Sequence, residues 1–192
     1  MELIFATNNR HKVEEIQAAI GNKITIRTLS DVGIDIDIPE PHDTLEANAL
    51  EKAMTIHKLT RSNCFSEDTG LEVEALGGEP GVMSARYAGD EKNFKKNIDK
   101  LLTNLGVEEN RNARFRTVIS LIWKENEYFF EGISEGRIIH SQRGNHGFGY
   151  DPVFVPSGSN KTFAEMDLEE KNRFSHRRKA ADKLVGFLQQ KG

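Results

Sequence analysis

Two adjacent carboxylates, Glu67 and Asp68, are the residues of this chain with the clearest capacity for chemistry. They follow a short apolar run that includes Phe65 and is typical of a buried strand, and Thr69 and Gly70 come directly after them. Carboxylate oxygens at a strand end suit a divalent metal, and a glycine turn lets the backbone approach phosphate. The same stretch is also compatible with an acidic corner that faces solvent. The rest of the chain has to decide between these two interpretations.

The N-terminal segment predicts a site for anionic oxygen. Residues 2–6 are typical of a buried strand, residues 7–12 are polar, and apolar side chains then recur at helical spacing until Gly21 ends the helix. Backbone N–H groups at a helix start, with Lys12 in its first turns, attract anions. An ordinary helix cap with a solvated lysine has the same pattern. The chain contains no Gly-x-x-x-x-Gly-Lys-Ser/Thr phosphate loop.

Glu40 stands between two prolines at the end of an alternating run, residues 33–38. The alternation predicts a strand with one wet face. The prolines fix the chain around Glu40, so this carboxylate either marks the end of the strand or serves as an aimed metal ligand.

A helix is expected next, because Asp43 and Glu46 resemble a capping box. Asn48 and Lys52 lie four residues apart and share a face of this helix. Such pairs usually face solvent, and Lys52 matters for the site only if this face turns toward Asp68.

Further strands and helices alternate along the chain. Strands are expected at residues 23–28, 63–67, 114–123, 127–133, 137–140 and 153–155, and an amphipathic helix at 91–105. Residues 71–76 fit a strand, an extended segment or a short helix. The loop at residues 143–152 combines glycines with aromatics, which suits a backbone that closes on a flat ring or an ordinary surface loop. Ser175 is expected to cap a terminal helix whose first turn holds His176 and Arg177, where the helix dipole disfavours cations, and such a local cost hints at function.

The composition predicts a soluble globular protein. The chain has 192 residues, 37% of them hydrophobic and 29% charged, and a formal net charge of −4. This charge argues against a broad nucleic-acid-binding face but is compatible with a local basic pocket for a polyphosphate. No apolar run approaches the roughly 18 residues of a membrane span, and no signal-peptide pattern precedes the first strand. We therefore expect a cytoplasmic protein with neither a nucleic-acid nor a membrane partner.

Cys64 is the only cysteine, so an internal disulfide is excluded and a reducing compartment is expected. A thiol in an apolar run is typical of a small buried side chain. A nucleophilic thiol is the alternative, although no activating histidine stands nearby in the sequence.

Six motifs in order resemble one family, the non-canonical purine nucleoside triphosphate pyrophosphatases, or Ham1-like inosine/xanthosine triphosphatases. They are Thr7-x-Asn9-x-x-Lys12, Glu46-x-Asn48-Ala49-x-x-Lys52-Ala53, Glu67-Asp68-Thr69-Gly70-Leu71, Gly81-x-x-Ser84-Ala85-Arg86-Tyr87-Ala88-Gly89, Phe148-Gly149-Tyr150-Asp151-Pro152 and Ser175-His176-Arg177. The resemblance implies an α/β fold: an elongated mixed sheet flanked by helices, one domain over residues 1–192 with two lobes and a central cleft. It also implies a homodimer that hydrolyses ITP, dITP and XTP to the monophosphate and pyrophosphate and so cleans the nucleotide pool.

The resemblance also implies roles for single residues and a requirement for Mg²⁺, one or more ions per subunit. Asp68 matches the metal ligand and general base, Glu40 matches a second metal ligand, and Glu67 assists. The implied substrate contacts are Thr7, Asn8, Asn9, Arg10, His11, Lys12, Lys52, Thr69, Phe148, Gly149, Tyr150, Asp151, Lys171, His176 and Arg177. The family usually has glycine where this chain has Asn8, which tolerates a left-handed backbone better than most residues.

Donor groups at His176 and Arg177 would favour a 6-keto purine over adenine, because adenine presents an N–H₂ at the same edge. This logic does not exclude GTP. Two other functions fit the same residues: a nucleotide sensor without turnover, and a pyrophosphatase that acts on modified pyrimidine nucleotides.

Overall fold

The computed structural model describes residues 1–191, and its helices and strands alternate as an α/β chain. The strands are β1 (Glu2–Phe5), β2 (Thr25–Thr28), β3 (Cys64–Val73), β4 (Pro80–Gly81), β5 (Asn112–Trp123), β6 (Asn126–Ile138) and β7 (Phe154–Pro156). The α-helices are α1 (Arg10–Ile20), α2 (Leu45–Thr60), α3 (Phe94–Leu105), α4 (Leu168–Asn172) and α5 (His176–Lys191). Short 3₁₀ turns occupy Gly21–Lys23, Ser30–Val32, Glu74–Leu76, Ser84–Arg86, Asp151–Val153 and Phe163–Glu165.

The sheet is mixed, as predicted. Its hydrogen-bonded order is β2-β1-β3-β5-β6-β7, and β4 pairs with β3. β1 runs parallel to β2 and β3, whereas β4 runs antiparallel to β3 and β7 antiparallel to β6. The α/β class with helices flanking a mixed sheet is therefore confirmed.

The chain divides into two compact units. Unit 1 comprises Met1–Asp68, Thr117–Gly132 and Arg177–Gly192, and unit 2 comprises Thr69–Arg116 and Ile133–His176. The division passes between Asp68 and Thr69 within β3. The expectation of a single domain with a central cleft stays a prediction.

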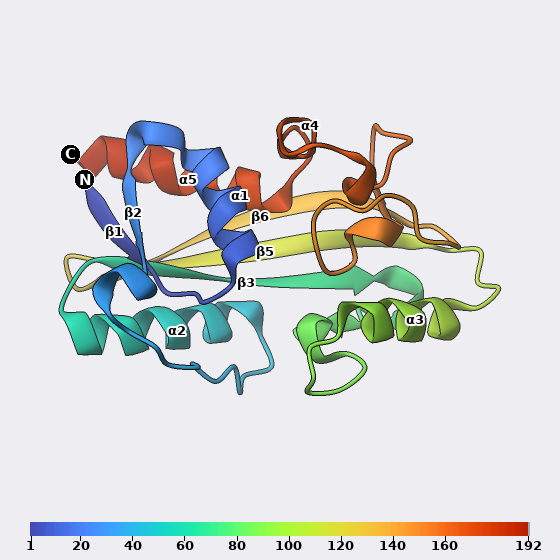
Figure 1. Ribbon diagram of the computed structural model, residues 1–192, viewed down its shortest axis with the longest axis horizontal. Coiled ribbons are helices and arrows are strands. Elements are labelled where there is room, and N and C mark those ends of the chain that lie inside the picture. Colours follow the sequence, from blue (N-terminus) through green and yellow to red (C-terminus); the bar gives the residue numbers. More distant parts are fainter. Residues whose placement is uncertain (192) are drawn as a thin grey trace. The chain divides into compact units, whose positions relative to one another are not determined.

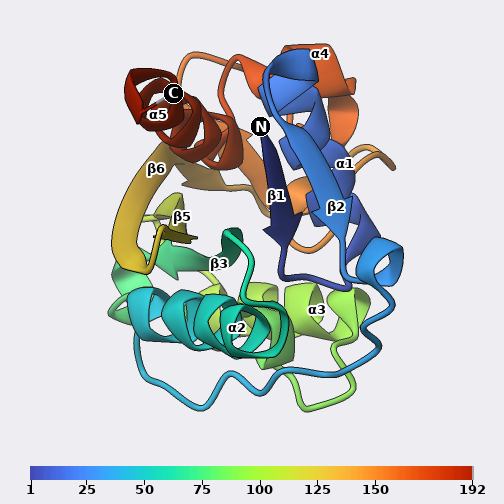
Figure 2. The same ribbon diagram turned by 90° about the vertical axis from the view of Figure 1, so that its left-hand side faces the viewer.

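Unit 1 is a three-layer structure with an apolar core on each face of its strands. α1 and α5 lie on one face and α2 lies on the other (Figures 1 and 2). The α1/α5 side buries Phe5 and Phe65, whose rings stack at 4.5 Å, together with Ile16 and Ala180. The α2 side buries Ile4, Ala53, Ile56, Cys64 and Ile122. Neighbouring residues of one strand thus enter different cores, because side chains alternate across a strand.

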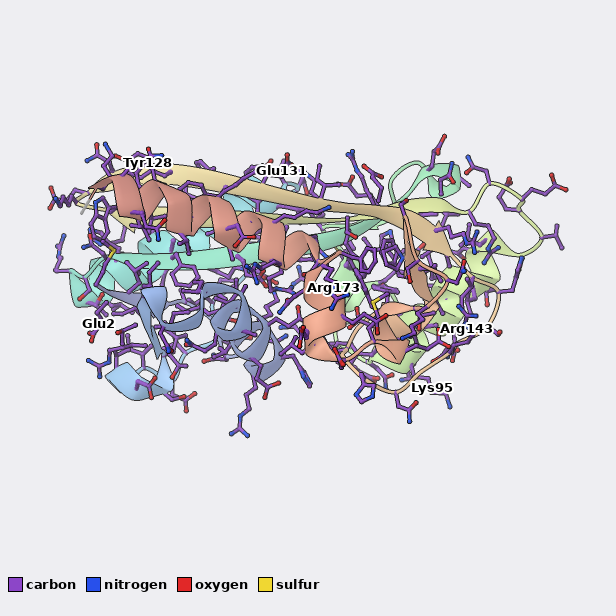
Figure 3. The ribbon with its side chains drawn as sticks, turned by 90° about the horizontal axis from the view of Figure 1, so that it is seen from above. Glu2, Lys95, Tyr128, Glu131, Arg143 and Arg173 are labelled. Carbon is purple, nitrogen blue, oxygen red and sulfur yellow. The ribbon has the colours of Figure 1, made fainter. Side chains whose placement is uncertain are left out.

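The C-terminal part of α5 packs on β6. Figure 3 shows Tyr128 where β6 runs beside this helix. The ring of Tyr128 lies 4.4 Å from that of Phe187, and the ring of Phe130 lies 5.5 Å from it. These aromatic contacts hold α5 on the sheet. Arg177, near the start of α5, pairs with Glu67 of β3.

Unit 2 has its own core, to which α3 contributes Ile98, Leu101 and Leu105. Figure 1 places α3 on one side of β3 and β5 and α4 on the other. Phe115, Phe154 and Phe163 form a connected aromatic group in this core, with the rings of Phe115 and Phe154 4.7 Å apart.

Several predicted elements are confirmed. Gly21 and Gly106 cap the C-terminal ends of α1 and α3, and β5 and β6 lie at the strands expected at residues 114–123 and 127–133. Residues 71–76 fit a strand, an extended segment or a short helix by sequence. They continue β3 to Val73 and then form a 3₁₀ turn.

Other expectations were wrong. The acidic pair does not end a strand: β3 runs on through Asp68, Thr69 and Gly70. Gly70 serves close packing here, because a Cβ at this position would stand 2.6 Å from the carbonyl oxygen of Gly81. Residues 33–38 form no strand, although their burial alternates as predicted, because the isoleucines of this segment pack on the α2-side core.

Three boundaries also differ. The cap of α2 is Thr44, whose hydroxyl accepts from the N–H of Ala47, and not Asp43. The strand expected at residues 137–140 is the end of β6, and the strand expected at 23–28 begins at Thr25. Among residues 1–191, no helix is long and apolar enough to cross a bilayer.

Candidate functional site

The two faces of β3 carry the predicted carboxylates in different directions. Cys64 and Ser66 point toward α2: the thiol donates to the carbonyl of Ala53 at 3.1 Å, and the hydroxyl donates to that of Ala49. Asp68 continues this side of the strand and meets Lys52 of the same helix. Phe65 and Glu67 point toward α1 and α5.

Asp68 belongs to a small cluster of ionised groups with Lys52 and Glu40. The ammonium of Lys52 lies 3.5 Å from a carboxylate oxygen of Asp68 and also pairs with Glu40. The side chains of Lys52 and Asp68 are 9% and 10% exposed, and that of Glu40 is 23% exposed. The predicted condition is therefore met: this face of α2 turns toward Asp68.

Burial and neighbouring charges together set the pKa values of Asp68 and Lys52. Burial raises the pKa of Asp68 above its usual value, although the charges of Lys52 and Lys12 partly oppose it. Burial alone would lower the pKa of Lys52, but the charges of Asp68 and Glu40 outweigh it, and the net direction is upward. Lys52 therefore stays charged, and Asp68 is a stronger base than an exposed aspartate.

Glu67 belongs to a different cluster, which the structure buries almost completely. Arg177 donates from Nε and Nη2 to the two carboxylate oxygens of Glu67 at 2.8 and 3.1 Å, and it also pairs with Glu15. The ammonium of Lys12 lies 3.0 Å from Glu67. Burial acts to raise the pKa of Glu67, but the charges of Arg177 and Lys12 prevail and lower it.

These contacts bear on two predicted roles. Both oxygens of Glu67 accept from cationic side chains, which supports an anchoring role over that of a metal ligand. Arg177 is 2% exposed, and three of its N–H donors face the carboxylates of Glu67 and Glu15. Its geometry therefore favours a structural anchor over contact with a base.

Glu15 is a member of this cluster that the sequence prediction missed. It is buried on α1, one residue before the core residue Ile16. A carboxylate on the apolar face of a predicted helix was the signal available, since buried acids in proteins are almost always paired.

The turn before α1 has the expected cap. Asn9 caps the helix and accepts from the N–H of Lys12, and the hydroxyl of Thr7 accepts from the N–H of Asn9. Asn8 does not adopt a left-handed backbone, and its side-chain amide donates to the carbonyl of Ile36 at 2.8 Å. Arg10 and His11 are exposed at the helix start.

Unit 2 collects the predicted aromatic and acidic residues of the loop before β7. Asp151 is 3% exposed and accepts from Lys171 at 2.6 Å and from the N–H of Phe148 at 2.9 Å. The ammonium of Lys171 lies 5.5 Å from the centre of the half-buried Phe148 ring. Tyr150 donates to the carbonyl of Ser84 at 2.8 Å.

Gly147, Gly149, His176 and Thr69 also belong to unit 2. A Cβ at Gly147 would stand 2.0 Å from a carboxylate oxygen of Asp151, and Gly149 has a left-handed φ of 61°. His176 is 2% exposed and stacks on Phe115 with ring centres 4.6 Å apart. Thr69 is half-buried in β3.

Glu40 and Asp68 form the donor set that suits a hard divalent cation. Mg²⁺ is usually held by one or two carboxylates, with phosphate oxygens and water as the remaining ligands. Lys52 contacts both carboxylates, so the two reach one common cation. Within residues 1–191, no group of three or more histidine, cysteine, aspartate or glutamate side chains could hold a metal by itself. The residues therefore fit a metal that is shared with a phosphate ligand.

Cys64 is the small buried side chain of the first interpretation. It is fully buried, and burial raises the pKa of its thiol to about 12. A nucleophilic role is incompatible with this environment, because the thiolate is the reactive form.

Comparison with known proteins confirms the resemblance. A family model described as the Ham1 family matches residues 3–187. The dITP/XTP pyrophosphatases of Flavobacterium psychrophilum and Porphyromonas gingivalis are 50% and 52% identical over 188 residues, which cover 98% and 97% of this chain and 99% and 97% of theirs. Among solved structures, the Staphylococcus aureus Ham1 protein has a TM-score of 0.89 and 37% identity, with 100% of both chains covered. The chain thus belongs to the Ham1 family.

Proposed function

We propose that the protein hydrolyses ITP, dITP and XTP to the nucleoside monophosphate and pyrophosphate, and thereby removes deaminated purines from the nucleotide pool. The observation that carries the proposal is the environment of Asp68: a buried carboxylate of raised pKa beside Lys52 and Glu40, in a member of the Ham1 family. Relatives that match nearly the whole chain are named dITP/XTP pyrophosphatases.

Glu40 and Asp68 are the residues that would hold a divalent metal, which we propose to be Mg²⁺, one or more ions per subunit. Such a metal supplies charge stabilisation at the phosphate and lowers the pKa of bound water. Lys52, which contacts both carboxylates, would then turn to a phosphate oxygen. Lysine suits this exchange, because its ammonium is a flexible point charge.

The reaction consumes one water molecule. The water oxygen attacks the α-phosphorus, the bond from that phosphorus to the bridging oxygen of the β-phosphate breaks, and pyrophosphate leaves. Asp68 accepts the proton of the water as general base, which its raised pKa favours. General-base action is typically worth about 10²–10⁴-fold, so positioning and charge stabilisation supply the rest.

The triphosphate is proposed to bind at the start of α1. Thr7, Asn9 and Lys12 face it, with the exposed turn residues Asn8, Arg10 and His11 beside them. Helix N–H groups and lysines offset its charge. Glu67 and Arg177 hold Lys12 in place, because Glu67 pairs with both cations.

The base and sugar are proposed to be held by side chains of unit 2. Phe148, Gly149 and Thr69 offer a ring face, an open backbone and a hydroxyl, and the buried Tyr150 holds the loop of Phe148 and Gly149 through its bond to the carbonyl of Ser84. Lys171, held by Asp151, and His176 supply hydrogen-bond donors, which suit the keto oxygen of hypoxanthine and xanthine. Adenine would present a donor to these donors and leave them unpaired.

We also propose that the protein acts as a homodimer in the cytoplasm. The family resemblance supports the dimer, and the single buried cysteine supports a reducing compartment. Light scattering coupled to size-exclusion chromatography tests the dimer: a mass of about 43 kDa supports it, and the 21.7 kDa of one chain contradicts it.

The decisive experiment is a panel of nucleotides with Mg²⁺ and separate assays for pyrophosphate and orthophosphate. ITP, dITP and XTP should release pyrophosphate faster than GTP, dUTP and methylated pyrimidine triphosphates. Release of orthophosphate would overturn the proposal. Tight binding of ITP without turnover would identify a sensor instead, and preference for the pyrimidines would identify the other pyrophosphatase class.

A further inference from the structure

Asn48 is a buried amide that the proposed chemistry does not use. It lies in the first turns of α2 and is 1% exposed. Its Oδ1 accepts from the N–H of His42 at 2.9 Å, and its Nδ2 donates to the carbonyl of the same residue at 3.0 Å. One side chain thus satisfies both polar backbone groups of a residue six positions earlier.

The segment that Asn48 holds is the connection between Ile38 and α2, which contains Pro39, Glu40 and Pro41. It belongs to no helix or strand. The two prolines have no N–H, so they cannot hold this segment by donating backbone hydrogen bonds. Fixing an irregular segment of this kind therefore depends strongly on side chains that reach it from a regular element.

Asn48 and Lys52 reach the segment from one face of α2. They lie four residues apart, so their side chains are neighbours on the helix. Asn48 holds the backbone of His42, and Lys52 pairs with the carboxylate of Glu40, two residues earlier. The two contacts fix both the path of the segment and the direction of its carboxylate.

We propose that Asn48 is a positioning residue that holds Glu40 at its place beside Lys52. Without the two bonds to His42, the backbone around Glu40 is released and its carboxylate no longer has one fixed position. The inference rests on the proposed function for the role of Glu40 as a metal ligand. The physical part, a fixed segment, stands on the contacts alone.

The first test uses the full-length Asn48→Ala variant and two readouts that need no turnover. Amide hydrogen exchange of His42, followed by NMR, should accelerate, because its N–H loses its acceptor. Affinity for Mn²⁺ in the presence of a saturating non-hydrolysable ITP analogue, measured by electron paramagnetic resonance, should fall by about 10–100-fold, as is typical when residues that orient metal ligands are removed. Unchanged exchange at His42 or unchanged Mn²⁺ affinity would overturn the proposal.

Asn97→Ala is the matched control. Asn97 is also buried, at 2% exposed, and belongs to unit 2. It likewise binds backbone groups of another segment: it accepts from the N–H of Ala88 and donates to the carbonyl of Ala85. Its removal should lower stability as much as that of Asn48 but leave the exchange of His42 and the affinity for Mn²⁺ unchanged. An equal loss of Mn²⁺ affinity in both variants would reduce the effect of Asn48 to general destabilisation.

If Asn48→Ala does not fold, the pair His42→Pro and His42→Ala asks the same question from the other partner. Proline removes the backbone N–H of residue 42, which donates to Asn48, whereas alanine keeps it. Weaker Mn²⁺ binding in His42→Pro alone supports the proposal, and equal binding in the two variants contradicts it.

Glu40→Gln separates this inference from the proposed function. If Asn48 acts through Glu40, the double variant Asn48→Ala/Glu40→Gln binds Mn²⁺ no more weakly than Glu40→Gln alone. Additive losses would overturn the positioning role. Normal Mn²⁺ binding by Glu40→Gln would instead overturn the assignment of Glu40 as a metal ligand. Amide exchange of His42 would then remain as the test of whether Asn48 fixes the segment.

Discussion

Glu67 and Asp68 are neighbours in the sequence with the same chemistry, yet the two faces of β3 give them opposite properties. On the α1/α5 side, Glu67 meets Arg177 and Lys12, and its pKa falls below the usual value. On the α2 side, Asp68 is buried beside Lys52 and another carboxylate, Glu40, and its pKa rises. Proximity in the chain therefore says little about the role of a carboxylate, since alternation along the strand decides which cations it meets.

The difference also separates structural from chemical use of charge. Cationic groups already satisfy the oxygens of Glu67, which makes it a poor base and a poor ligand. Asp68 shares its lysine with Glu40, so a metal can replace the lysine between the two carboxylates and a phosphate oxygen can bind the lysine.

Asp68→Asn should give the largest effect on activity. The amide cannot accept the proton of water, so hydrolysis of ITP should fall by about 10²–10⁴-fold while the fold is retained. Pyrophosphate release and circular dichroism measure the two quantities. Glu67→Gln should preserve more activity than Asp68→Asn, and the reverse order would break the assignment of roles to the two faces.

Arg177→Met should give the largest effect on stability. It leaves Glu15 and Glu67 buried without a cation that each now contacts, and removing one partner of a buried ionic cluster costs about 3–5 kcal/mol. Urea unfolding measures the loss. Arg178→Met is the control, because its exposed pair with Asp182 should contribute only about 0.3–0.5 kcal/mol. Equal losses in both variants would mean that Arg177 is no anchor.

The pH dependence of stability should differ in sign between the two carboxylates. The pKa of Glu67 is lowered in the folded state, so its stabilisation is present above the unfolded pKa and is lost as the pH falls. The pKa of Asp68 is raised, so its contribution is present below the unfolded pKa and is lost as the pH rises.

Urea unfolding of the wild type, Glu67→Gln and Asp68→Asn from about pH 3 to about pH 7 tests these signs. The stability advantage of the wild type over Glu67→Gln should grow with pH. Its advantage over Asp68→Asn should shrink. Parallel curves for the two variants would mean that the two faces do not differ electrostatically.

Local patterns in the sequence predicted most of the elements. Gly21 and Gly106 end helices, Lys124 and Glu125 adopt the positive φ of a hairpin turn, and apolar spacing marks α3. The alternating pattern was misleading at residues 33–38. The isoleucines of this segment face a core and alternate with exposed residues, although the segment has no partner strand.

The partners of the charged residues could not be predicted in the same way. Glu67 meets Arg177 across 110 positions of sequence, and Glu15 meets it across 162. Such pairs depend on how α1, β3 and α5 pack, and no periodicity encodes that. The family resemblance identified Asp68, Lys52 and Glu40 as residues of interest, but only the structure assigned Glu67 and Arg177 to one buried cluster.

Cys64→Ala should give the smallest effect, which makes it a control for the α2 side of β3. Cys64 lies on the same side as Asp68 but contributes only packing and one bond to the carbonyl of Ala53. Stability should fall by about 1 kcal/mol, and hydrolysis of ITP should not change. Iodoacetamide should alkylate the thiol in urea but not in the folded protein, because burial raises its pKa to about 12. A Cys64→Ala variant that folds but no longer hydrolyses ITP would mean that the thiol takes part in the reaction. Asp68 and Lys52 would then not be the only reactive groups on the α2 side of β3.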